Sequence, residues 1–352
     1  MNILYLGTDS STSKHRADAL ARLGHAVTLL DPAQFLPAHP VFRKLNWEAG
    51  GLFSQPAVTR GVLGRIADAR FDVAWVDSGR YVGPSLIRAL QGRGSRVLNY
   101  NHDDPFGRRD RYSWLLYLKA VSAYDLVAVV REENVAEANA RGARKVVRVY
   151  RSADEVAHAP RPLSAEDHER CDSEVCFVGT WMPERGPFLA ELLRLGVPLT
   201  IYGNAWQRAR EWPELRSAWR APDRLGDEYP KTIQCAKISL GLLSKGNRDL
   251  HTTRTAEIPF MGGLFCAERT SDHRFLYEEG QEAVFWSDAA ECARVCRELL
   301  ADEPRRREIA RRGRARCIAN GTLNERMMSD LLAEALPAEK ADLARNLQDS
   351  PV

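Results

Sequence analysis

Short apolar runs alternate with amphipathic segments along this chain, and this alternation limits the folds open to it. In the first half, the runs Asn2–Gly7, Ala26–Leu30 and Phe71–Val76 predict buried strands separated by helices. Consecutive parallel strands need a long crossover, usually a helix, so this spacing favours parallel pairing. The sequence therefore predicts a doubly wound α/β sheet.

The pattern stops at a stretch that contains Pro160 and Pro162, and then starts again. New strands are predicted at Glu174–Gly179, Leu199–Tyr202 and Ala236–Leu242. A chain of 352 residues is long enough for two such domains. We expect the following division: an N-terminal Rossmann-like domain 1–155, a linker 156–172, a C-terminal Rossmann-like domain 173–322, a closing helix 323–336 that can return to the first domain, and a polar tail 337–352.

Charge and hydropathy narrow the class of protein. The net charge of +3 comes from 50 basic and 47 acidic residues, which gives no electrostatic case for nucleic acid as a partner. No run approaches the roughly 18 apolar residues of a membrane span, and no cleavable signal is evident, so we expect a cytoplasmic protein. The spacing of the arginines in Arg305–Arg316 predicts a solvated helix face, and peripheral membrane contact is the alternative. The oligomeric state is not indicated.

The seven cysteines all lie between Cys171 and Cys317. Their number is odd, and neither a C-x-x-C pair nor a Cys/His zinc spacing occurs. Several lie in apolar runs, where a free cysteine behaves as a small hydrophobic residue. Reduced core thiols and no metal site are therefore expected, with a structural metal or a redox pair as the alternative.

The segment Ser244–Gly263 follows a predicted strand and begins a helix near Thr252 or Thr253. Lys245 and Arg254 could bind a diphosphate there, since their charges would add to the partial positive charge of a helix N-terminus. Glu257, one turn later, could accept hydrogen bonds from ribose or sugar hydroxyls. The competing interpretation is an ordinary capped helix with an i,i+3 Arg–Glu pair.

In the first half, polar residues follow the predicted strands. His102 with Asp103 and Asp104 could form a general base, because neighbouring carboxylates raise the pKa of a histidine. Asp-Asp-Pro is equally good turn chemistry, so a turn cluster fits as well. Gly7-Thr8 offers a backbone that the phosphates of a bound nucleotide can approach closely.

A set of motifs occurs in order from about residue 95 to 335, and it includes Asp103-Asp104-Pro105, Val175–Thr180, Leu199–Asn204, Arg254–Leu264 and Phe275–Gly280. In these motifs the chain resembles the CgeB-like (spore maturation protein) glycosyltransferases. The resemblance implies a GT-B fold, with two doubly wound Rossmann-like domains facing a central cleft. It also implies a nucleotide donor in the C-terminal domain, an acceptor toward the N-terminal domain, and no required metal or other cofactor.

The chain is also similar to the retaining glycosyltransferase family 4, from which it departs at two motifs. That family has a Glu-x7-Glu motif, and here Glu257 matches the second position while Asp249 replaces the first glutamate. Its Arg-x4-Lys diphosphate pair corresponds to Thr180 and Arg185, so the first charge is missing. Lys245 or Arg254 could compensate.

We therefore expect a glycosyltransferase that moves a sugar from a UDP-, GDP- or dTDP-linked donor to a carbohydrate or other hydroxyl acceptor. A sugar-nucleotide epimerase or hydrolase, and a non-catalytic assembly protein, are the alternatives. The expected catalytic residues are His102, Asp103, Asp104 and Asp249. The expected donor-binding residues are Gly7, Thr8, Gly179, Thr180, Arg185, Tyr202, Gly203, Lys245, His251, Thr253, Arg254 and Glu257. Alanine at Arg254 or Glu257 is expected to abolish transfer and leave the fold intact.

Overall fold

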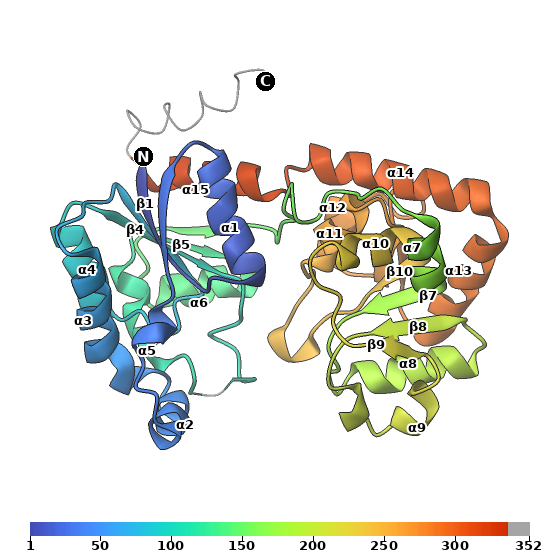
Figure 1. The fold of residues 1–352 in the computed structure, drawn as a ribbon, viewed down its shortest axis with the longest axis horizontal. Coiled ribbons are helices and arrows are strands. Elements are labelled where there is room, and N and C mark those ends of the chain that lie inside the picture. The colour runs from blue at the N-terminus through green and yellow to red at the C-terminus, as the bar shows by residue number, and fades with distance from the viewer. Residues whose placement is uncertain (111, 337–352) are drawn as a thin grey trace. The chain divides into compact units, whose positions relative to one another are not determined.

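The structure, a computed structural model, describes residues 1–110 and 112–336, so the predicted polar tail 337–352 lies outside the described residues. The chain divides into two compact units (Figure 1). The first unit comprises Met1–Tyr150, Gly246–Arg248 and the segment that begins at Asn324. The second comprises Arg151–Lys245 and Asp249–Leu323.

The first unit is built on a parallel sheet in the order β2-β1-β3-β4-β5-β6. Its strands are β1 (Asn2–Leu6), β2 (Ala26–Leu30), β3 (Val73–Asp77), β4 (Arg96–Asn101), β5 (Leu126–Val129) and β6 (Val146–Arg148). Its α-helices are α1 (Ser11–Arg22), α2 (Pro40–Glu48), α3 (Gln55–Ile66), α4 (Pro84–Gly92), α5 (Leu115–Ala120), α6 (Glu132–Ala140) and α15 (Asn324–Ala335). Short 3-10 turns occur at η1 (Pro32–Phe35), η2 (Leu52–Ser54) and η3 (Val121–Ala123).

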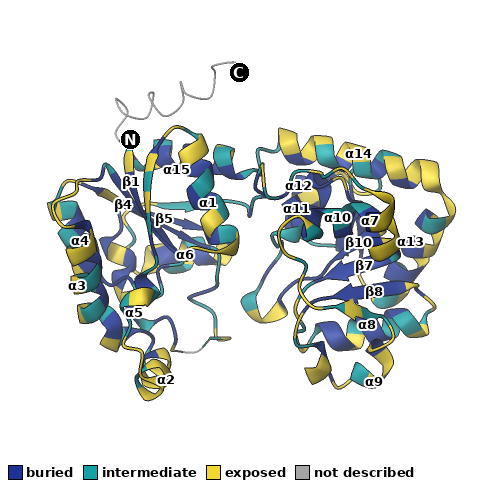
Figure 2. Cartoon of the chain, in the orientation of Figure 1, coloured by how far each residue is buried: buried dark blue, intermediate teal, exposed yellow. Residues whose placement is uncertain are grey.

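Helix α15, from the end of the chain, covers one face of this first sheet beside α1 (Figure 1). Its apolar side chains Met328, Leu331 and Leu332 are buried against the strands of this sheet. These positions follow the i, i+3, i+4 spacing of one helix face, which is why the segment is helical and seals the core here. The central strands β1, β3, β4 and β5 are almost entirely buried, as parallel strands between two helix layers must be, whereas the edge strands β2 and β6 are partly exposed (Figure 2).

The second unit has a parallel sheet in the order β12-β11-β10-β7-β8-β9. Its strands are β7 (Ser173–Val178), β8 (Leu199–Tyr202), β9 (Trp219–Ala221), β10 (Ala236–Gly241), β11 (Phe265–Glu268) and β12 (Val284–Trp286). Its α-helices are α7 (Ala165–Cys171), α8 (Arg185–Arg194), α9 (Trp212–Leu215), α10 (Glu228–Cys235), α11 (Arg254–Phe260), α12 (Ser271–Leu276), α13 (Ala289–Ala301) and α14 (Glu303–Ala319). Two 3-10 turns are η4 (Trp206–Arg208) and η5 (Lys245–Asn247).

Two doubly wound parallel sheets confirm the predicted fold class. The predicted linker 156–172 differs from what the structure contains, because α7 lies within it and His158 is buried in the second unit. Helix α7 begins with a capping box in which Ser164 and Asp167 exchange hydrogen bonds. The prolines before Ser164 suggested a linker, but the Arg161 amide donates to Gln234 Oε1 at 2.8 Å and Lys231 pairs with Asp167 at 3.0 Å, so the stretch is anchored to the second unit.

The arginine-rich helix α14 is balanced by acidic neighbours. Arg311 and Arg312 both pair with Glu308, and Arg316 pairs with Glu282. Arg306 is buried and donates to the carbonyl of Leu299. Most of this helix is a solvated, internally paired face, as expected from its spacing. Among residues 1–110 and 112–336, no helix has both the length and the apolar composition that a membrane crossing needs.

Candidate functional site: two switch points

The second sheet has a topological switch point between β7 and β10. These strands are neighbours in the sheet, and the chain winds outward from them in opposite directions. In open parallel sheets, ligands bind in the crevice at the carboxyl ends of the strands, where the strand order reverses. The residues that follow β7 and β10 are therefore the first candidates for a ligand site.

Arg185, the first residue of α8, connects the ends of these two strands. Its Nη1 atom donates to the carbonyl of Thr180 at 2.7 Å, and its Nη2 atom donates to the carbonyl of Leu242 at 3.3 Å. The guanidinium also lies 5.5 Å from the centroid of the Phe177 ring. A buried cation held by two strand-end carbonyls is a fixed positive charge at the switch point.

The glycines predicted at this edge are required by close backbone contact. Gly203 has a φ of 138°, and a Cβ atom there would lie 2.0 Å from the carbonyl oxygen of Gly179. Any side chain at Gly203 would collide with the turn after β7. The loops after β7 and β8 are thus pressed together, and Trp206 Nε1 donates to the Gly179 carbonyl at 3.0 Å.

Arg254 and Glu257 form a pair in α11 in which Glu257 is buried and Arg254 is partly exposed. The Glu257 carboxylate contacts Arg254, accepts from the Tyr229 hydroxyl at 2.9 Å, and lies 3.6 Å from His158 Nε2. Arg254 Nε donates to the Val178 carbonyl at 3.2 Å, so its guanidinium also reaches the end of β7. Burial would raise the pKa of Glu257, but the Arg254 and His158 charges outweigh it and hold that pKa below its ordinary value.

A cavity of about 150 Å³ lies beside Arg185 and Lys245. Sequence reasoning did not propose its other polar and aromatic lining residues as site residues, namely Glu184, Phe188, Glu268, Trp286, Ser287 and Asp288. The rings of Phe188 and Trp286 stack with centroids 4.4 Å apart, and Lys245 pairs with Glu268. Glu268 and Trp286 end β11 and β12, so the strand-end rule applied to all strands would have found them.

Four predicted residues of this unit have other contacts. Tyr202 is buried and accepts from Arg220 at 3.1 Å, while Thr253 precedes α11 and lies beside the Arg254 side chain. Asp249 is buried, with its carboxylate 3.1 Å from Arg151 Nη2. His251 is buried as well.

The protonation of His251 follows from its two contacts. Its Nε2 atom accepts from the Arg151 amide at 3.1 Å, so Nδ1 carries the proton that faces Asp272 at 2.8 Å. Burial lowers the pKa of His251, and this effect outweighs the hydrogen bond to Asp272, which raises the pKa. Together with Asp249, this histidine holds the start of the second unit to the segment before α11.

The first sheet has its own switch point, between β1 and β3. A cavity of about 240 Å³ lies there, and Gly7, Thr8, Asp77 and Asp103 line it. Gly7 fits because an added Cβ would lie 2.5 Å from the Ser13 hydroxyl oxygen and 2.7 Å from the Tyr5 ring. The predicted approach point at Gly7-Thr8 is therefore part of a real concavity.

His102 lies between two carboxylates of this unit. Its Nδ1 atom is 3.9 Å from Asp77 Oδ1, and its Nε2 atom is 3.9 Å from Asp103 Oδ2. Asp77 is itself buried and paired with Arg16 at 2.8 Å, and despite burial the Arg16 and His102 charges hold its pKa below the ordinary value. The structure thus places His102 beside Asp103, which lines a cavity.

Asp104 turns away from this group. It is buried and receives hydrogen bonds from Arg248 Nε and Nη2, both at 2.7 Å, and from Asn134 at 2.9 Å. Burial opposes ionisation, but these hydrogen bonds outweigh it and lower the pKa of Asp104. Because Arg248 and Asn134 occupy its carboxylate oxygens, Asp104 is poorly placed to act as a base. It instead anchors Arg248, which belongs to the same unit.

Comparison with known proteins agrees with this geometry. Residues 185–333 match a family model described as glycosyl transferase-like. The structure is similar to sucrose-phosphate synthase from Thermosynechococcus elongatus, with 13% identity, a TM-score of 0.68, and coverage of 95% of this chain and 98% of that one. No curated protein sequence matches the chain.

Two further solved structures have the same fold. HepE from Anabaena, in complex with UDP-glucose, is 14% identical with a TM-score of 0.65, and 95% of this chain and 98% of that chain are covered. A glycosyltransferase from Rickettsia africae is 13% identical with a TM-score of 0.61, and 99% of each chain is covered. At such identities the likeness establishes the fold, and the family match adds the activity. The chain is a GT-B glycosyltransferase whose second unit carries most of the glycosyl transferase-like region.

Proposed function

We propose that this enzyme transfers a sugar from a nucleotide-sugar donor to a hydroxyl acceptor, with the nucleoside diphosphate bound by the second unit. The observation that supports this most is the pair of guanidinium groups at the end of β7. Arg185 donates to the Thr180 carbonyl and Arg254 donates to the Val178 carbonyl, so two cations converge on one strand end at the switch point. Fixed cations stabilise the charge that develops on a leaving diphosphate.

The cavity of about 150 Å³ is small for a whole nucleotide and suits one part of it, such as the base. The stacked pair of Phe188 and Trp286 supplies an aromatic wall, and Glu268 is a carboxylate that could accept from ribose hydroxyls. An arriving diphosphate would compete with Glu268 for the Lys245 ammonium. HepE, which shares the fold, binds UDP-glucose, so uridine nucleotides are the first ones to try.

For the acceptor, we assign the base to His102 in the first unit. The acceptor hydroxyl gives its proton to His102, its oxygen bonds to the anomeric carbon, and the nucleoside diphosphate leaves with the electron pair of the broken bond. Asp77 and Asp103 flank the ring and stabilise the imidazolium that forms. In a front-face mechanism, the leaving phosphate would take that proton instead.

Glu257 and Asp249 have supporting roles in this proposal. Glu257 matches the second glutamate of the family 4 motif, and its contacts hold the Arg254 guanidinium toward β7. Asp249, in the first motif position, is neutralised by Arg151. A CgeB-like relationship fits this arrangement. The assembly-protein alternative is disfavoured because Arg185, Lys245 and Arg254 are all retained at the switch point.

The test is a thermal-shift screen of the full chain against UDP, GDP, CDP, dTDP, ADP and their sugar conjugates, without added metal. A ligand at 100 times its Kd should stabilise the protein by about 2.7 kcal/mol. We expect one nucleotide family to act, and we expect Arg185→Met and Lys245→Ala to abolish the shift. Lys245 is exposed, so its substitution does not endanger folding.

Arg194→Met is the matched control, because Arg194 lies in the same helix but is exposed and pairs with Glu214. It should keep the full shift. If no nucleotide shifts the folded protein, or if the shift persists in both site variants, the donor site is assigned wrongly.

A further inference from the structure

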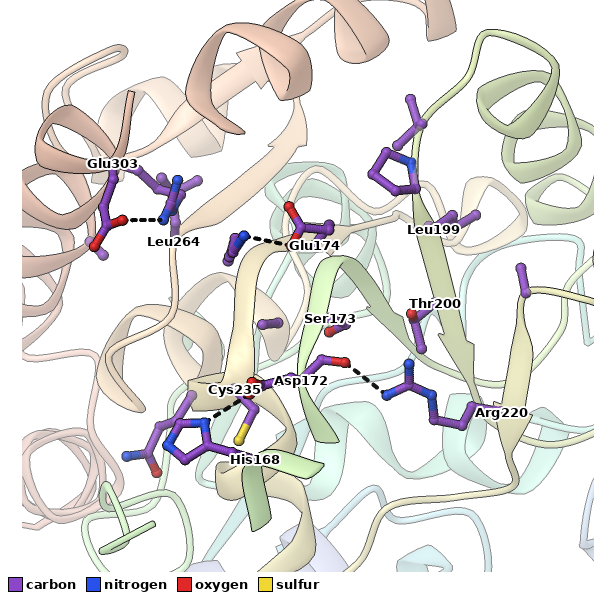
Figure 3. A pocket seen from close by; sticks show the side chains of 18 of the residues that line it. His168, Asp172, Ser173, Glu174, Leu199, Thr200, Arg220, Cys235, Leu264 and Glu303 are labelled. Atoms are coloured by element: carbon purple, nitrogen blue, oxygen red, sulfur yellow. Dashed lines mark hydrogen bonds and ion pairs between the residues drawn. The ribbon is translucent and has the colours of Figure 1, made fainter. Parts of the chain in front are cut away.

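A cavity of the second unit lies at the amino edge of its sheet, away from Arg185. Its volume is about 870 Å³, and Ser173, Leu199 and Ala236, which begin β7, β8 and β10, line it (Figure 3). Substrates of open parallel sheets bind at the carboxyl edge, so this cavity is separate from the donor site.

Three potential metal ligands meet in this cavity. His168 lies in the last turn of α7, Asp172 follows that helix, and Cys235 ends α10. One ligand atom from each, a ring nitrogen, a carboxylate oxygen and the thiol sulfur, lie within 4.8 Å of one another. Figure 3 shows the three side chains together, and His168 Nδ1 is 2.8 Å from Asp172 Oδ1.

This set of donors fits zinc. Nitrogen, oxygen and thiolate sulfur are the protein ligands of Zn²⁺, at about 2.0 to 2.3 Å, and three of them leave one position for water. In a tetrahedral site such ligands lie roughly 3.3 to 3.8 Å apart. In the structure the three ligand atoms lie within 4.8 Å of one another. The side chains of His168 and Asp172 are 51% and 61% exposed, so they can move to the tetrahedral spacing without repacking the core. Cys235 is buried and provides a fixed anchor.

We propose that His168, Asp172 and Cys235 bind a Zn²⁺ ion that links α7 to α10. The sulfur–zinc bond replaces the thiol proton of Cys235, which leaves to solvent, and neutral His168 and ionised Asp172 complete the protein ligands. The helices α7 and α10 already pack on each other. The ion adds a cross-link between α7 and the end of α10, directly before β10. The ion would lie at the edge of the sheet opposite the proposed donor site, so it takes no part in the proposed sugar transfer.

A second group of cysteines could also bind a metal ion, so the test must distinguish it from the proposed site. Cys266, Cys292 and Cys296 also lie within 4.8 Å of one another, but all three are buried in the apolar core between β11 and α13. They line none of the cavities described above. A thiolate signal from a bound metal must therefore be assigned to one group or the other.

The experiment uses the full chain, freed of metal by a chelator and kept reduced. Zn²⁺ is titrated by calorimetry, and Co²⁺ by its thiolate charge-transfer absorption, which reports a Co–S bond. We expect one equivalent to bind, with a higher melting temperature in the presence of zinc. Cys235→Ser and His168→Ala should each weaken binding by at least about tenfold to a hundredfold, the loss seen even for outer-shell changes.

Cys292→Ser is the matched control, and it should keep both the affinity and the cobalt spectrum. The proposal is overturned if the wild-type chain takes up no metal. It is also overturned if binding persists in Cys235→Ser and His168→Ala, or if it is lost only in Cys292→Ser. His168 is exposed, so its variant remains informative even if Cys235→Ser folds poorly. Nucleotide binding should survive removal of zinc, so failure of this proposal leaves the donor-site proposal standing.

Discussion

Replacing Glu257 by glutamine would remove one charge from a buried pair and leave the other in place. The Glu257 side chain is 2% exposed, and its carboxylate contacts Arg254, Tyr229 and His158. Glutamine has nearly the same shape, so the change tests charge rather than packing. The main loss of folding stability then comes from the Arg254 guanidinium, which no longer has a negative partner.

The magnitude follows from burial. Removing one partner of a buried ion pair costs roughly 3 to 5 kcal/mol. The Arg254 side chain is 28% exposed, so water can partly solvate the charge that remains, and we expect the lower end, about 3 kcal/mol. For a domain of this size the melting temperature falls by about 2 to 4 °C per kcal/mol, which gives a decrease of roughly 6 to 12 °C.

The effect should also depend on pH. The folded pKa of Glu257 is lowered, so its stabilising contribution is complete above the unfolded value of about 4.3 and is lost as the pH falls through the folded value. The stability gap between wild type and Glu257→Gln should therefore narrow below about pH 4. This burial also revises the expectation that alanine at position 257 leaves the fold intact.

Thermal unfolding and hydrogen exchange of the peptide that covers α11, at pH 7, 5 and 4, would measure both effects. Glu308→Gln is the matched control, because Glu308 pairs with Arg311 and Arg312 on an exposed helix face. It should change stability by less than about 0.5 kcal/mol. Equal melting of wild type and Glu257→Gln at pH 7, or a gap that stays constant with pH, would refute the argument.

Three further changes test other parts of the structure. Gly203→Ala should destabilise the second unit by well over 1 kcal/mol in urea unfolding, because its Cβ would collide with a carbonyl; Gly196→Ala, with φ at 78° and open space, should cost only about 1 kcal/mol. Asp77→Asn should lower the stability of the first unit by about 3 kcal/mol or more, since it leaves a buried arginine without its partner; an unchanged melting curve would contradict this. His102→Ala should reduce kcat by about 10² to 10⁴-fold in a transfer assay with little change in donor KM, and full activity would exclude it as the base.

The sequence by itself determined the two sheets. Parallel strands buried on both faces must be apolar along their length, so Leu199–Tyr202 could be located to the residue. The edge strand Ala26–Leu30 was located equally well, although only Leu30 in it is buried. Gly203 was found because it follows a predicted parallel strand, whereas Arg185 was found through the similarity to the Arg-x4-Lys motif of family 4. The search for apolar runs failed for β9, because Trp219–Ala221 is three residues long and its burial is partial, so no run of apolar residues marks it.

Only the tertiary structure decided which charges are available to a substrate. Asp104 and Asp249 looked like catalytic acids, but each is paired with an arginine far from it in sequence, Arg248 and Arg151. Likewise Cys235 reaches His168 and Asp172 only through the packing of α10 on α7. Periodicity reports which face of an element is buried, whereas the partner of a buried polar group depends on residues that the fold brings together from distant parts of the chain.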